Sequence, residues 1–87
     1  MRTIYRYPLR VTDVQTITGP GLGRIVAVDN RRGELEVWAE VDTHDMEMTR
    51  SVIIVPTGNE IPRGAGRHVG HVIDGPFVWH IYEGGYQ

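Results

Sequence analysis

Histidine side chains have the widest chemical range in this chain, because an imidazole can bind a metal ion or transfer a proton near neutral pH. His68 and His71 are three residues apart, and on a regular strand that spacing places two side chains on opposite faces. A bulge at Gly70 would change that geometry. His44 falls in a predicted turn, and His80 falls in an alternating segment near the C-terminal end. We therefore expect ordinary polar residues of strands and turns, with no metal ligands and no cofactor.

Nucleophilic chemistry has little support in the sequence. There is no cysteine, and the only serine, Ser51, lacks the flanking glycines of a nucleophile elbow. Glu36 and Glu40 share one face of a predicted strand, a pattern that we interpret as charged protection of a sheet edge. We expect no catalytic residue and a protein that is not an enzyme. A small enzyme that uses His71 or His80 with a carboxylate is an alternative.

Two glycine-rich segments are candidates for phosphate-binding loops. Residues 19–23 lack the Lys-Ser/Thr pair of a P-loop and precede a strand, so no helix dipole is available there. In residues 63–67, two arginines flank three small residues, an arrangement that can bind an anion through backbone N–H groups and guanidiniums. The alternative is a flexible connection between strands. The candidate ligand-binding residues are Arg63, Arg67, Thr57, Asn59 and His80.

Composition narrows the possible functions. The chain has 87 residues, nine arginines, no lysine, no cysteine and a formal net charge of −2. Its length predicts one small domain spanning residues 1–87, and the charge argues against a nucleic-acid-binding protein. Arginine without lysine is typical of a GC-rich genome, although selection for bidentate recognition of carboxylate or phosphate would give the same bias. No apolar run is long enough for a membrane span or a signal peptide.

Alternating apolar and polar residues, interrupted by glycine and proline, predict an all-β fold with no substantial helix. The expected form is six or seven antiparallel strands in a small barrel or sandwich. In the third strand, one face carries Ile25 and Ala27 and the other carries Val26 and Val28. Residues 83–87 are predicted to be a frayed tail. The predicted strands span residues 2–10, 14–18, 24–29, 35–42, 48–55, 67–73 and 77–82.

Trp38 is an aromatic residue on an otherwise charged strand face, between Glu36 and Glu40. Such a residue can anchor a binding partner or pack under a loop. We favour packing or a subunit interface, because a domain of this size gains stability when it buries an exposed tryptophan. A homo-oligomer is therefore expected. Trp79 shares its face with two apolar residues and is predicted to lie in the core.

Three segments carry a family resemblance. They are the Thr-Ile-Tyr-Arg-Tyr opening at 3–7, the Thr-Gly-Asn-Glu-Ile-Pro block at 57–62 and the Phe-Val-Trp-His segment at 77–80, with Val-Trp-Ala at 37–39 between them. Together they resemble a small domain of unknown function found in actinobacteriophages and related actinobacterial genomes. Pro56 stands where that family has the first glycine of a turn. The resemblance implies a phage or actinobacterial source, and no activity or site residue.

These observations lead to three functional hypotheses. We expect a non-catalytic phage accessory protein that acts by binding, either blocking a host or defence factor or sequestering a nucleotide signal. A virion or assembly component is one alternative, and the histidine-dependent enzyme is the second. The expected partners are a host protein or a small anionic ligand, and a second copy of the chain. The expected location is the cytoplasm of the infected host.

Overall fold

The computed structural model describes residues 1–87 and contains seven strands and no helix. The prediction of an all-β fold is therefore confirmed. No helix in the structure could span a membrane. The strands are β1 (Arg2–Leu9), β2 (Val14–Pro20), β3 (Ile25–Arg31), β4 (Glu34–Asp42), β5 (Glu47–Pro56), β6 (His68–Asp74) and β7 (Phe77–Tyr86).

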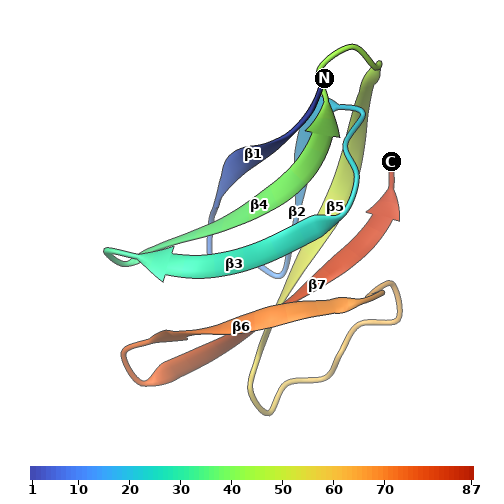
Figure 1. The fold of residues 1–87 in the computed structure, drawn as a ribbon. Helices are drawn as coiled ribbons and strands as arrows, with labels where there is room; N and C mark the ends of the chain where they lie inside the picture. Colours follow the sequence, from blue (N-terminus) through green and yellow to red (C-terminus); the bar gives the residue numbers. More distant parts are fainter.

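The strands form two antiparallel sheets, ordered β1-β4-β3 and β2-β5-β7-β6 (Figure 1). β3 and β6 meet at one edge, where the Asn30 Nδ2 group donates a hydrogen bond to the Ile73 carbonyl at 3.1 Å. No backbone ladder joins the two sheets. Of the two expected architectures, the structure is therefore a sandwich and not a closed barrel.

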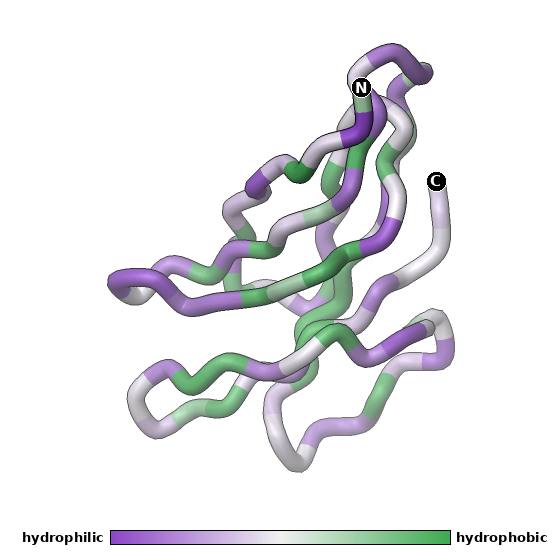
Figure 2. The backbone as a smooth tube through the Cα atoms, viewed as in Figure 1, coloured by the Kyte–Doolittle hydropathy of each residue, from purple (hydrophilic) through white to green (hydrophobic).

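The core fills the space between the sheets. On β4 the apolar residues at alternate positions, Leu35, Val37, Ala39 and Val41, are buried as predicted, because alternate side chains of a strand share one face. Figure 2 shows the apolar stretch of β5 running through the middle of the molecule. All residues of 51–55 are buried, so β5 is internal and apolar on both faces, as its sequence predicts. The main core cluster comprises Leu9, Ile17, Leu22, Ile25, Leu35, Val37, Ala39, Val41, Val52, Ile54, Val72 and Ile81.

The prediction of which β3 side chains share a face is wrong after the first residue of the strand. Ile25 pairs with Ala39 and is fully buried, but a bulge between Ile25 and Ala27 shifts the register. Ala27 consequently pairs with Trp38 on the outer face, and Val28 faces the core. A bulge adds one residue to one strand, and this reverses the alternation that follows.

The predicted frayed tail is also wrong. β7 continues to Tyr86, and the Gln87 amide donates to the Thr49 carbonyl at 2.8 Å. The Tyr86 hydroxyl donates to the Leu22 carbonyl at 3.0 Å, and its ring lies under the Arg50 guanidinium at 4.6 Å. Residues with so many polar partners do not fray, whatever their position in the chain.

Candidate functional site

A pocket of about 260 Å³ lies between the segment after β5 and the outer face of β5 and β7. We call it the loop pocket. Pro56 ends β5, and Gly58, with a φ of 94°, permits the turn in which the Asn59 amide donates to the Pro56 carbonyl at 3.0 Å. The Thr57 amide donates to the Val78 carbonyl at 3.1 Å and fixes the loop to β7. The lining residues are Val55, Pro56, Thr57, Gly58, Asn59, Ile61, His80 and Tyr82.

His80 is held at both ring nitrogens. Its Nε2 atom lies 3.1 Å from the Thr57 Oγ1 atom, and its Nδ1 atom lies 3.2 Å from the His68 Nε2 atom. The register pairs Val55 with His80 and Ile53 with Tyr82, so these side chains share the outer face of the sheet. The ring partners of His80 are thus a hydroxyl and an imidazole, whereas the enzyme hypothesis requires a carboxylate.

His68, His71 and His80 gather on this outer face; we call them the histidine cluster. A register shift between His68 and Gly70 pairs His68 with Tyr82 and His71 with His80. The ring centroids of His68 and His71 lie 5.4 and 5.9 Å from that of His80. The prediction that strand spacing separates His68 from His71 is therefore wrong, because the strand is bulged. In their present rotamers no three metal-ligating side chains converge on one point.

Arg67 lies away from the loop pocket. Its Nε atom donates to Glu83 Oε1 at 2.9 Å, and its guanidinium also donates to the Ile25 carbonyl. Glu83 Oε2 accepts the Ile25 amide at 2.8 Å and lies 3.3 Å from Arg50 Nη1. Arg63 is exposed and makes no ion pair or side-chain hydrogen bond. The two arginines that the sequence placed in one anion clamp therefore have different surroundings.

The Glu83 carboxylate is only 5% exposed. Burial acts to raise its pKa, but the hydrogen bonds from Arg67 and the Ile25 amide outweigh that effect, together with the charges of Arg50 and Arg67. The net result is a Glu83 pKa below its ordinary value. The carboxylate joins β7 to β3, β5 and the segment before β6, so its role is structural. Sequence analysis missed this residue by placing it in a frayed tail.

Trp38 lies half-buried on the outer face of the β1-β4-β3 sheet, between Arg6 and Ala27 in register. Its neighbour Glu36 is 2% exposed, and its carboxylate is within 2.8 Å of Arg6 Nη1 and 3.1 Å of Arg31 Nε. The interpretation of Glu36 and Glu40 as edge protection is wrong, because β4 is the central strand of its sheet and is paired with a strand on each side.

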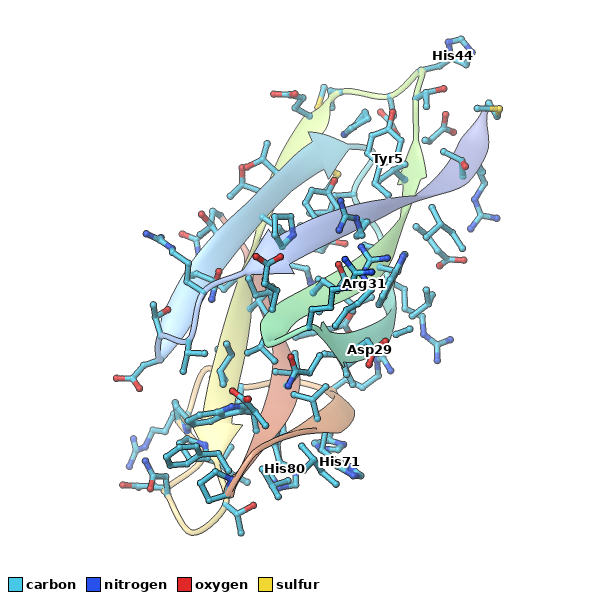
Figure 3. All side chains as sticks on the ribbon, turned by 90° about the vertical axis from the view of Figure 1, so that its left-hand side faces the viewer. Tyr5, Asp29, Arg31, His44, His71 and His80 are labelled. Carbon is cyan, nitrogen blue, oxygen red and sulfur yellow. The ribbon has the colours of Figure 1, made fainter.

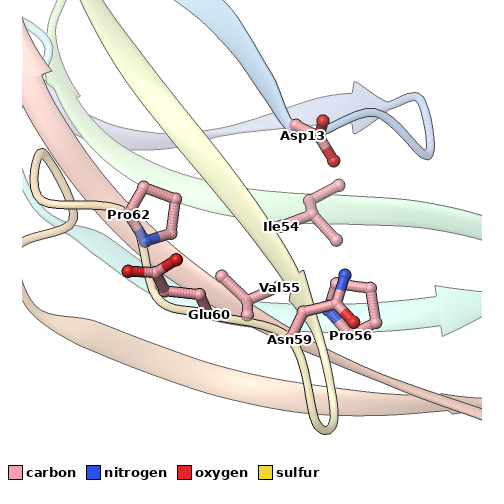
Figure 4. A pocket seen from close by; sticks show the side chains of 7 residues that line it. All are labelled: Asp13, Ile54, Val55, Pro56, Asn59, Glu60 and Pro62. Atoms are coloured by element: carbon pink, nitrogen blue, oxygen red, sulfur yellow. The ribbon is translucent and has the colours of Figure 1, made fainter.

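A second, larger pocket of about 430 Å³ lies near the same loop (Figure 4). Two carboxylates, from Asp13 and Glu60, are among its lining residues. Carboxylates repel an anion, whereas the loop pocket has none among its lining residues. The loop pocket is therefore the better candidate for an anionic ligand.

The loop pocket brings together three of the five candidate ligand residues: Thr57, Asn59 and His80. Tyr82 and Ile61 complete it and carried no sequence signal of their own. No curated protein and no solved structure matches the chain significantly. A family model described as "Domain of unknown function (DUF7352)" matches residues 1–87. The chain therefore belongs to this family of domains of unknown function.

Proposed function

We propose that this protein is a non-catalytic binding protein whose ligand site is the loop pocket. The observation that carries the proposal is the convergence of Thr57, Asn59 and His80 on one pocket, although His80 lies on β7 and the other two lie in the loop after β5. The pocket combines hydrogen-bonding side chains with the apolar surfaces of Ile61 and Tyr82. Such a mixture is typical of small-molecule sites, where a few polar groups fix orientation.

The chemistry of the pocket favours a nucleotide-like ligand. The Asn59 side-chain amide can donate and accept hydrogen bonds, as the polar edge of a base requires, and the Thr57 hydroxyl oxygen can accept one. The Tyr82 ring offers an aromatic surface next to them, and bases bind aromatic side chains by stacking. The ring of His80 adds hydrogen-bonding nitrogens to the same pocket.

The biological setting of this proposal is a phage accessory protein that sequesters a nucleotide signal in the cytoplasm of an infected cell. It is supported by the family resemblance in the sequence and by the arginine-only composition, which is typical of a GC-rich genome. A virion component remains the alternative prediction, and detection of the protein in purified particles would favour it.

Thermal melting with a panel of cyclic dinucleotides and ADP-ribose derivatives tests the proposed ligand class. At a ligand concentration of one hundred times Kd, binding adds about 2.7 kcal/mol to stability, which raises Tm by roughly 10–20 °C in a domain of this size. We expect Asn59→Ala to abolish the shift. His44→Gln, at the opposite end of the molecule, should retain it (Figure 3). A panel that leaves Tm unchanged at millimolar concentration would exclude nucleotides as ligands.

A protein partner on the Trp38 face is the second candidate, and the chemistry of the face favours a second copy of the chain. It presents Trp38 and a 54% exposed Ile4 together with charges of both signs, including Arg2 paired with Glu40 at 3.3 Å. Mixed charge around an apolar centre can be self-complementary across a two-fold axis.

Sedimentation velocity at micromolar concentration tests this interface. We expect a dimer for the unmodified protein and a monomer for Trp38→Ala, because an aromatic anchor removed from an interface centre typically costs about 2 kcal/mol or more of binding. Asn59→Ala, on the other sheet, should remain dimeric. A monomeric unmodified protein would exclude the interface.

A further inference from the structure

The histidine cluster is placed by two features that act together. The bulge between His68 and Gly70 rotates His68 onto the face that already carries His71 and His80. His71 and His80 are then directly opposite each other on paired strands, where Cβ atoms are roughly 4.5–5.5 Å apart. Three imidazoles therefore lie on one face of the sheet, with the ring centroids of His68 and His71 at 5.4 and 5.9 Å from that of His80.

We propose that the histidine cluster binds one divalent transition-metal ion, with zinc as the first candidate. Imidazole nitrogen is a preferred ligand of zinc, copper and nickel. Two nitrogens bound to one tetrahedral zinc ion at about 2.0–2.1 Å lie about 3.3–3.4 Å apart. The distance between His68 Nε2 and His80 Nδ1 is 3.2 Å, so these two atoms already have nearly the spacing of a ligand pair.

The second ring nitrogen of His80 has the partner that a metal-bound histidine needs. A ligating imidazole usually donates its other N–H to an oxygen, which fixes the tautomer and the ring orientation. His80 Nε2 lies 3.1 Å from Thr57 Oγ1, and the Thr57 hydroxyl donates its own hydrogen bond to the Val78 carbonyl at 3.4 Å. His80 Nε2–H then donates to Thr57, which leaves the Nδ1 lone pair free for a metal ion.

The metal-bound form requires the rings of His68 and His71 to rotate. In the present rotamers His68 and His80 are hydrogen-bonded to each other, and no three ligands converge. His68 and His71 are both exposed, so their rings can turn without displacing core residues. A metal ion would replace the shared hydrogen bond, His71 would supply the third nitrogen, and solvent would supply the fourth ligand.

Isothermal titration of tag-free protein with ZnCl2 tests the site. We expect one zinc ion per chain and a rise in Tm of at least about 5 °C at saturation. His68→Gln, His71→Gln and His80→Gln should each weaken zinc binding by at least about tenfold. His44→Gln is the matched control, because His44 lies at the opposite end of the molecule from His71 and His80 (Figure 3). MgCl2, which prefers oxygen ligands, should give no shift.

The test separates this inference from the proposed nucleotide site. His71 does not line the loop pocket. The His71→Gln variant should therefore lose zinc binding and still bind the nucleotide, whereas the Asn59→Ala variant should bind zinc and lose nucleotide binding. When zinc is added to the unmodified protein, the largest changes in amide NMR chemical shift should fall on residues 68–71 and 80. This measurement does not require any variant to fold. Absence of zinc binding at 100 times the protein concentration, or an equal loss in His44→Gln, would overturn the proposal.

Discussion

Glu83→Gln is expected to lower the free energy of unfolding by about 3 kcal/mol, because it removes the charge from a buried carboxylate that holds two guanidiniums. Glu83 lies 2.9 Å from Arg67 and 3.3 Å from Arg50. The Arg50 side chain is only 16% exposed, so its charge would be left largely desolvated without a carboxylate partner. The corresponding fall in Tm is roughly 10–20 °C, measurable by circular dichroism.

Arg67 and Arg63 provide the matched comparison for this network. Arg67→Ala removes one of the two cations on Glu83 and should destabilise the protein by about 1–3 kcal/mol, whereas Arg63→Ala, on an exposed side chain without partners, should change stability by less than about 0.5 kcal/mol. Equal effects of the two substitutions would show that the Glu83 contacts contribute nothing to stability.

The pH dependence of stability follows from the lowered pKa of Glu83. In the unfolded chain its pKa is near the ordinary glutamate value of about 4.3, and in the folded protein it is lower. The unfolded state therefore binds the proton first as the pH falls, and the stability that Glu83 contributes above pH ~5 is lost progressively below it. Glu83→Gln should remove this part of the acid sensitivity, and acid titration of both proteins in urea measures the difference.

Ile25→Ala is expected to destabilise the protein by about 3–4 kcal/mol, within the range for deleting a large aliphatic side chain from a core. Ile25 is fully buried, whereas its neighbour Val26 is 43% exposed. Val26→Ala should therefore cost less than about 1 kcal/mol. Urea denaturation of both variants measures the difference. A similar loss in both would contradict the arrangement in which the Ile25 side chain lies in the core and the Val26 side chain faces outward.

Some of the candidate ligand residues could be identified from the sequence, and others could not. Thr57 and Asn59 were identifiable because glycine and proline mark the loop that carries them, and His80 because it lies on the polar side of an alternating strand. The sequence paired Arg67 with Arg63 as the two ends of one glycine-rich segment. The contact of Arg67 with Glu83, sixteen residues away, separates the two, and local patterns contain no information about such a contact.

The sequence by itself determined the all-β class and the approximate extent of the seven strands, because alternation and glycine or proline breaks are properties of neighbouring residues. Only the tertiary structure decided on which side of the sheet each side chain after a bulge lies, and that Glu36 and Glu83 are buried. A bulge depends on how a strand meets its partner, and it reversed the expected positions of Ala27 and Val28 and brought His68 beside His80. A buried carboxylate is stable only where distant cations and amides reach it, and the folded chain supplies them.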